Sequence, residues 1–222
     1  MAADESGGRP VDAFLYGDYV CPFSYLLSVR LTRLEDDLGL RVHWRPLAVH
    51  AAVPSDGLPV GQLGRSPDER SRIEAEVGRQ ARELGVELEL PDFVANSHEA
   101  LQAAEFARDV GEASFRRVHR ALFRAYLVEG RNLGRREVLL EVAREAGLDR
   151  EGVERALEDG RYRSELARAE EEAERYGIEG TPTLLVGRHK VVGAAPAEVI
   201  REAADRARRD RGSDRPPRGA SG

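Results

Sequence analysis

The sequence contains very little cysteine and no long apolar run. Cys21 is the single cysteine among 222 residues, so no disulfide can form within the chain. No stretch approaches the roughly 20 consecutive apolar residues of a membrane-spanning helix. Residues 1–10 have neither the apolar core nor the cleavage pattern of a signal peptide. We therefore expect a cytoplasmic protein with a free thiol and no membrane partner.

An excess of positive charge is also absent. The chain has 34 basic and 40 acidic residues, a net charge of −6, so we expect no general attraction to nucleic acid. Hydrophobic residues make up 41% of the chain, which is enough for a well-buried core. No metal site is expected, because the five histidines lie far apart without metal-ligand spacing: His43, His50, His98, His119 and His189.

Cys21 lies where a strand-like run ends and a helix-like run begins, within the segment Asp18–Tyr25. A thiol at a helix N-terminus faces unpaired backbone N–H groups and the positive end of the helix dipole, and both favour the thiolate. Pro22 suits the first helical turn, since its missing N–H would have no partner there. A lone cysteine is more often a small buried hydrophobic residue. This setting instead makes Cys21 a candidate nucleophile.

A second informative segment, Gly180–Thr183, lies far downstream at the start of a strand-like run. Proline lacks the donor that a central strand needs, so Pro182 at the first strand position indicates an edge, a bend or a cis peptide bond. A cis bond between Thr181 and Pro182 would expose the Thr181 backbone beside a facing thiol.

Together these segments resemble a known family. Cys-Pro-x-x-Tyr after a first strand, with Gly-Thr-Pro-Thr before a late hairpin and a final helix, resembles the thioredoxin superfamily. The nearer likeness is to its DsbA-like branch and to FrnE-type proteins, and it covers about residues 11–207. Further matching stretches are Asn96–Gly111, Ala121–Tyr126 and Val192–Ala194. The resemblance implies a thiol-disulfide oxidoreductase in which Cys21 attacks the substrate and Pro22, Phe23, Tyr25, Thr181 and Pro182 contact it.

The chain departs from the dithiol motif at Ser24, which stands where FrnE-type proteins have a second cysteine. Exchange by a dithiol enzyme needs that second thiol to clear the mixed disulfide. We therefore predict a monothiol mechanism with a thiol or disulfide substrate, either protein or small molecule. An outside thiol such as glutathione would resolve the mixed disulfide as co-substrate, and no other cofactor is expected. The Ser24 hydroxyl would hydrogen-bond the Cys21 sulfur and favour its thiolate.

A more distant likeness leaves alternatives open. Kappa-class glutathione transferases and 2-hydroxychromene-2-carboxylate isomerases carry Ser-Pro-Tyr-Ser at this position, and Ser24 follows their pattern whereas Cys21 does not. Those relatives tend to have Ser or Asn followed by Asp-Arg after the late hairpin. This chain has Gly193–Pro196, without a carboxylate for a glutathione amino group. We favour the FrnE-like function over a glutathione-dependent isomerase or transferase, and over a catalytically degenerate binding module.

The periodicity predicts an α/β, thioredoxin-like fold with a large all-helical insertion. Val11–Tyr16 indicates a strand, Leu27, Leu31, Leu34 and Leu38 form a helical stripe, and residues 41–47 alternate as a second strand. Two late strands and a final helix from Pro196 complete the fold, and no second sheet is expected. The predicted divisions are a discontinuous thioredoxin-like domain (11–48 and 177–208), a loop (48–64), a helical insertion that roofs the thiol (65–176) and flexible termini (1–10 and 209–222).

Within the insertion, Asn96 and His119 are the residues most worth locating relative to Cys21. Asn96 is followed three residues later by Glu99, as at a capped helix start. A Cys–His hydrolase would need one histidine beside the thiol, although nothing around Cys21 resembles a cysteine-protease signature.

Overall fold

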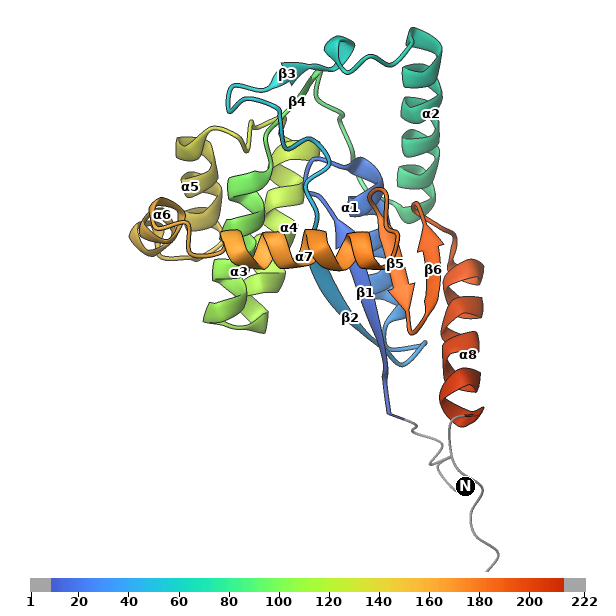
Figure 1. The fold of residues 1–222 in the computed structure, drawn as a ribbon. Helices are drawn as coiled ribbons and strands as arrows, with labels where there is room; N and C mark the ends of the chain where they lie inside the picture. Colours follow the sequence, from blue (N-terminus) through green and yellow to red (C-terminus); the bar gives the residue numbers. More distant parts are fainter. Residues whose placement is uncertain (1–8, 214–222) are drawn as a thin grey trace, which may run out of the picture.

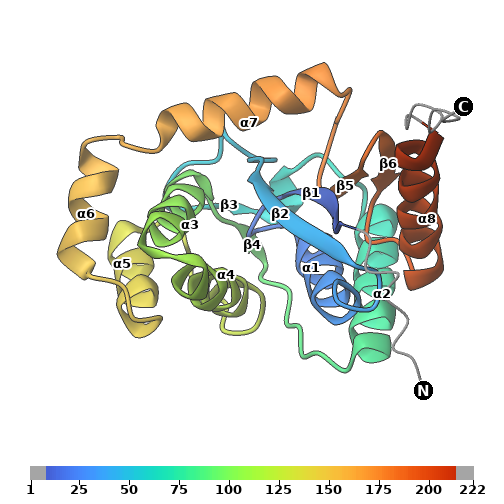
Figure 2. The same cartoon turned by 90° about the horizontal axis from the view of Figure 1, so that it is seen from below.

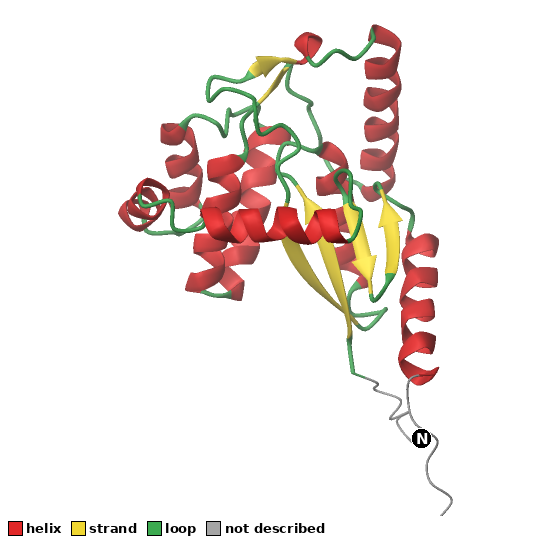
Figure 3. Cartoon of the chain, in the orientation of Figure 1, coloured by secondary structure: helices red, strands yellow, loops and turns green. Residues whose placement is uncertain are grey.

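The structure is a computed structural model that describes residues 9–213 (Figures 1 and 3). The strands are β1 (Val11–Gly17), β2 (Leu40–Pro46), β3 (Leu58–Pro59), β4 (Phe93–Val94), β5 (Thr183–Val186) and β6 (His189–Val192). The helices are α1 (Pro22–Leu34), α2 (Pro67–Leu84), α3 (His98–Val110), α4 (Glu112–Leu127), α5 (Arg136–Glu145), α6 (Arg150–Glu158), α7 (Arg163–Arg175) and α8 (Ala197–Ser213). Residues 209–213, predicted to belong to a flexible tail, continue α8; residues 1–8 and 214–222 lie outside the described part.

The main sheet has the strand order β2-β1-β5-β6. β1 is parallel to β2 and antiparallel to β5, and β5 and β6 form a hairpin. Along β1, alternate residues enter different layers: Val11, Ala13 and Leu15 join the main core, while Tyr16 joins a smaller cluster. This alternation sets the register in which β1, from the N-terminal part of the chain, pairs with β5, from the C-terminal part.

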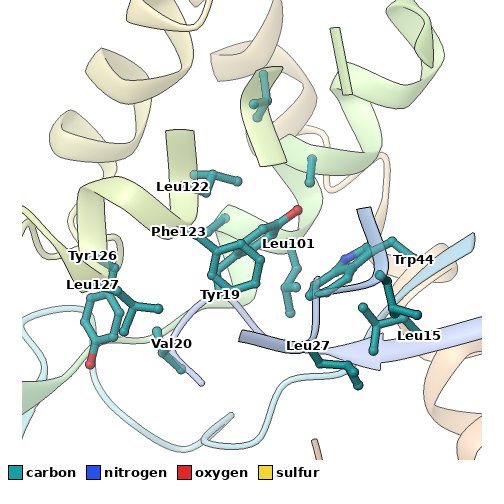
Figure 4. Packing of buried hydrophobic residues seen from close by; sticks show 14 of the residues in the cluster. Leu15, Tyr19, Val20, Leu27, Trp44, Leu101, Leu122, Phe123, Tyr126 and Leu127 are labelled. Carbon is teal, nitrogen blue, oxygen red and sulfur yellow. The ribbon is translucent and has the colours of Figure 1, made fainter. Parts of the chain in front are cut away.

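Helices cover both faces of the sheet (Figure 2). α7 crosses one face, where Tyr16 packs with Ala173, Ile178 and Leu185. α1 lies on the other face, and α8 packs against β5 and β6. The main core extends from the sheet into the helices that follow α1 and precede α7 in sequence. Tyr19, Leu27, Trp44, Leu101 and Phe123 are among its members (Figure 4). The sheet and the inserted helices therefore share one hydrophobic core.

Helices α3, α4, α5 and α6 pack together beside the sheet (Figure 1). α2 lies apart from them and packs against α1. A capping box stabilises its start, since the Ser66 hydroxyl accepts from Glu69 N and the Glu69 carboxylate accepts from Ser66 N. Between residues 9 and 213, no helix is both long and apolar enough to cross a lipid bilayer.

Three local expectations need correction. A second, two-stranded sheet exists, because β3 pairs with β4 through Leu58 and Val94. It interrupts the stretch expected to be helical, and strands of two residues are too short to leave a periodic pattern. α1 ends at Leu34, so Leu38, the last residue of the predicted helical stripe, lies beyond it. α3 begins after Ser97, and the Asn96 side chain instead accepts from His98 N and donates to the Val53 carbonyl.

Candidate functional site

Cys21 occupies the N-cap position of α1, with Pro22 as the first helical residue. The backbone of Cys21 is extended (φ −95°, ψ 111°), and its carbonyl accepts from Ser24 N at 3.0 Å and from Tyr25 N at 3.3 Å. Its own N–H donates to the Asp18 carbonyl at 3.1 Å. The turn between β1 and α1 thus holds the thiol at the helix start, where the sequence predicts it.

The second segment meets the thiol directly, although 160 residues separate the two in sequence. Cys21 Sγ lies 3.5 Å from the Thr181 carbonyl oxygen and donates to it. The antiparallel pairing of Tyr16 with Thr183 brings this segment beside β1, and the Thr181–Pro182 peptide bond is cis. On its other side, the Pro182 carbonyl accepts from Gly193 N at 2.8 Å. The β1–α1 turn and the start of β5 therefore face each other across the sulfur.

Two buried polar residues, Ser24 and Asp18, lie next to Cys21. The sequence predicted a role for Ser24 but not for Asp18. Ser24 is fully buried and its Oγ accepts from Asp18 N at 3.3 Å. Asp18, also fully buried, accepts from Val20 N at 3.2 Å and from Val49 N at 2.8 Å. Burial raises the pKa of Asp18 despite these hydrogen bonds. The signal that could have identified Asp18 is an acidic residue three positions before the cysteine, without a basic neighbour in sequence.

The environment of Cys21 opposes its ionisation. Burial raises the pKa of the thiol above its ordinary value, and the nearby Asp18 carboxyl raises it further. The Ser24 side chain and backbone N–H and the Thr181 side chain act in the opposite direction and lower the pKa of the thiol. Burial outweighs them, so the neutral thiol is favoured where the sequence predicted a thiolate. The helix N-terminus alone does not decide this pKa.

A cavity of about 430 Å³ opens beside the thiol. Cys21, Pro22, Phe23 and Thr181 line one side of it. Its remaining walls come from α2, from the β3–β4 region and from the end of α4. Most of these wall residues are apolar, and the acidic, basic and histidine side chains among them are His50, Arg65, Arg70, Glu74 and Glu179. The site can therefore enclose a small molecule or a short extended chain against the sulfur.

Comparison with known proteins identifies the family of this thiol site. A family model for the DSBA-like thioredoxin domain matches residues 13–205. The chain belongs to this family. Its members include thiol-disulfide oxidoreductases, and the predicted DsbA-like relationship and thioredoxin-like fold are confirmed.

Solved structures resemble this DsbA-like chain over nearly its whole length. A probable DsbA oxidoreductase from Streptomyces coelicolor is 26% identical, with a TM-score of 0.79, over 95% of this chain and 94% of that one. A 2-hydroxychromene-2-carboxylate isomerase is 22% identical, with a TM-score of 0.72, over 92% and 100%. The cytosolic disulfide reductase DsbM from Pseudomonas aeruginosa, solved with GSH, is 22% identical, with a TM-score of 0.60, over 91% and 98%. The last two share the fold.

The residues that the sequence singled out fall into two groups in this DsbA-like structure. Cys21, Pro22, Phe23 and Thr181 share the cavity, with Ser24 buried below and Pro182 buried behind Thr181. Tyr25 does not line this cavity. Its ring lies against Phe123 at a centroid distance of 5.3 Å and borders a different cavity on the other side of α1. The helical turn separates Phe23 and Tyr25, because residues two apart do not share a helix face.

Two histidines also lie at different cavities, His50 at the thiol cavity and His119 at the cavity on the other side of α1. His50, which the sequence did not single out, lines the thiol cavity, and burial followed by the charge of Arg65 lowers its pKa. His119, which it did single out, instead bonds Tyr19 and Ser28. Among residues 9–213 no three His, Cys, Asp or Glu side chains gather as a metal site would require. His50 lay in a segment without periodicity, so only the fold shows its place.

Proposed function

We propose that this protein is a monothiol thiol-disulfide oxidoreductase in which Cys21 forms a mixed disulfide that an external thiol resolves. The single observation that carries this proposal is the placement of Cys21 Sγ at the start of α1, 3.5 Å from the Thr181 carbonyl oxygen. The sulfur also borders a cavity large enough for a substrate. Membership of the DsbA-like family supports the reaction type.

The reaction needs two exchanges at one sulfur. In the first, the Cys21 thiolate attacks one sulfur of a substrate disulfide, an Sγ–S bond forms, and the second substrate sulfur leaves as a thiolate that takes up a proton. In the second, an external thiolate attacks the substrate sulfur of the mixed disulfide, Cys21 leaves as thiolate, and the substrate sulfur is left bonded to the external sulfur. A second external thiolate then attacks that external sulfur, and the substrate sulfur leaves as a thiolate that takes up a proton. The substrate disulfide is reduced by two electrons when two external thiols become a disulfide. This supply of thiols suits a cytoplasmic location, which is part of the proposal.

Five of the predicted residues have a role in this scheme. Cys21 is the nucleophile, and the Ser24 hydroxyl stabilises its thiolate. The Thr181 backbone aligns an extended substrate by β-like hydrogen bonds, while Pro22 and Phe23 contact its side chains. Glutathione is the proposed external thiol. The GSH present with DsbM, a neighbour of the same fold, supports this choice.

The decisive experiment is intact mass spectrometry of the purified protein after exposure to oxidised glutathione at several pH values. We expect one glutathione adduct, formed faster as pH rises, because burial raises the pKa of Cys21 and only the thiolate reacts. Added reduced glutathione should remove the adduct. Cys21→Ser, which keeps a small polar residue, serves as the control and should form none.

A second candidate is a glutathione-dependent isomerase or transferase on the same fold. The largely apolar cavity beside Cys21 favours it, since such a cavity suits a small organic substrate. Calorimetry that detects glutathione binding while mass spectrometry detects no adduct would support this candidate against the first. The absence of any adduct at every pH tested, or an adduct that reduced glutathione does not remove, would contradict the monothiol scheme.

A further inference from the structure

A second cavity, of about 280 Å³, lies on the other side of α1 from the thiol. Residues of α1, β2 and α4 line it, and Figure 2 shows where these elements meet. It shares no lining residue with the cavity at Cys21. It is therefore a separate space, and what binds there does not depend on the thiol chemistry proposed above.

The walls of this cavity are aromatic. Tyr25, Trp44, Phe115 and Phe123 contribute to its lining. Phe123 stands perpendicular to Trp44 at a centroid distance of 5.8 Å, and Tyr25 tilts against Phe123 at 5.3 Å. Such walls suit stacking and edge contacts with a planar ring. Since an apolar cavity of about 150 Å³ holds benzene, this volume accommodates a two-ring aromatic molecule.

A neutral polar group lies at one side of the cavity. The lining residues His119 and Ser28 are joined by a 2.8 Å hydrogen bond at Nε2, and Tyr19 OH lies 2.9 Å from His119 Nδ1. Burial lowers the pKa of His119 to about 3, so the imidazole is neutral at pH 7. A base with so low a pKa cannot activate the Ser28 hydroxyl effectively. The group therefore offers hydrogen bonds to a ligand rather than nucleophilic catalysis.

The rim of the cavity carries uncompensated positive charge. Arg33, Arg116 and Arg120 line it together with Glu35 and Glu112. Both carboxylates lie against Arg116, at 3.6 Å and 2.9 Å. Arg33 donates to a backbone carbonyl, and the Arg120 side chain makes no hydrogen bond or ion pair with any residue between 9 and 213. A guanidinium free at the mouth of an aromatic cavity favours an anionic ligand.

We propose that the cavity between α1, β2 and α4 binds a small planar aromatic carboxylate. Its rings pack among Tyr25, Trp44 and Phe123, and its carboxylate reaches Arg120 at the rim. Ser28 supplies a hydrogen bond to a polar substituent. The ligand would contact α1 one to two turns beyond Cys21, on the opposite side from the thiol cavity.

The test uses 2-naphthoate as probe and Trp44, the single tryptophan of the chain, as reporter. We expect a saturable 1:1 change in Trp44 emission, with the same stoichiometry by calorimetry. Carbamidomethylation of Cys21 should leave the affinity unchanged, which keeps this result independent of the proposed redox function. Arg120→Ala should weaken 2-naphthoate binding about threefold to fivefold, as expected for one exposed charge contact. The neutral isostere 2-naphthamide should be unaffected by that substitution.

Val29→Phe places a ring inside the cavity and should weaken binding at least about tenfold, as a steric block does when it removes about 1.4 kcal/mol or more. Circular dichroism checks its folding, and if it does not fold, Thr32→Phe at the exposed rim serves as the same block. Two results would overturn the proposal. One is the absence of saturable binding at millimolar 2-naphthoate, and the other is binding that survives the block but disappears on alkylation of Cys21.

Discussion

Arg30 joins three parts of the protein behind the thiol site, and its replacement by methionine tests that connection. This buried guanidinium, on α1, donates from Nη1 to the carbonyls of Ala194 at 3.0 Å and Ala195 at 2.7 Å. Its Nη2 donates to Gln80 Oε1 on α2 at 3.3 Å. The adjacent Gly193 N–H donates to the Pro182 carbonyl, next to Thr181. Arg30 therefore positions the loop that supports the wall opposite Cys21.

Arg30→Met keeps most of the apolar stem but removes all three donors. Two of the acceptors, the Ala194 carbonyl and Gln80 Oε1, are bonded in buried surroundings. Each buried acceptor left without a partner costs about 1–3 kcal/mol. We expect a loss of about 3 kcal/mol in the free energy of unfolding, which for a chain of this size lowers Tm by about 6–12 °C.

Urea denaturation followed by circular dichroism measures this loss. Arg206→Met is the matched control, because that arginine is exposed on α8 and its side chain forms, among residues 9–213, one ion pair, with Glu202 at 3.5 Å. It should cost no more than about 1 kcal/mol. If Arg30→Met loses no more than the control, the buried hydrogen bonds do not hold the loop and the reasoning is refuted.

Three further predictions follow from groups near the two cavities. Asp18→Asn removes a negative charge near the sulfur and should lower the pKa of the Cys21 thiol, so the alkylation rate should rise at lower pH; an unchanged pH profile contradicts this. His119, with a pKa of about 3 when folded against 6.5 ordinarily, takes up fewer protons folded than unfolded between these values. Stability should therefore fall as pH drops through that window by up to about 1.4 kcal/mol per pH unit, and His119→Gln should remove this dependence in urea titrations at pH 4–7. Ser66→Ala should cost about 1 kcal/mol by loss of the α2 capping box, whereas an equal loss in the exposed mid-helix control Ser71→Ala would argue against the cap.

The sequence by itself determined the elements whose signals are local. A continuous apolar run, a cysteine and a proline specify strand, turn and helix at Cys21, because each of these preferences acts within a few residues. Pro182 at the start of β5 was readable for the same reason. The motifs also sufficed to indicate the DsbA-like family and the α/β fold, both of which hold in the structure.

Other features depended on contacts between distant segments. The β3–β4 pair joins residues about 35 positions apart in sequence and is too short to show periodicity. Arg70 lies beside the thiol because α2 packs on α1, and His50 lies there because its neighbour Val49 N donates to the Asp18 carboxyl. Such non-local pairings are absent from any window of the sequence.

Tertiary structure alone decided the electrostatics of the site. The helix N-terminus favours a Cys21 thiolate, but burial of the sulfur together with Asp18 raises the pKa of the thiol. Helix geometry separates Phe23 from Tyr25, but only the packing around α1 decides that Phe23 borders the thiol cavity and Tyr25 the other one. The sequence determines which ionisable groups are present, whereas the cost of removing a charge from water depends on all the residues packed around it.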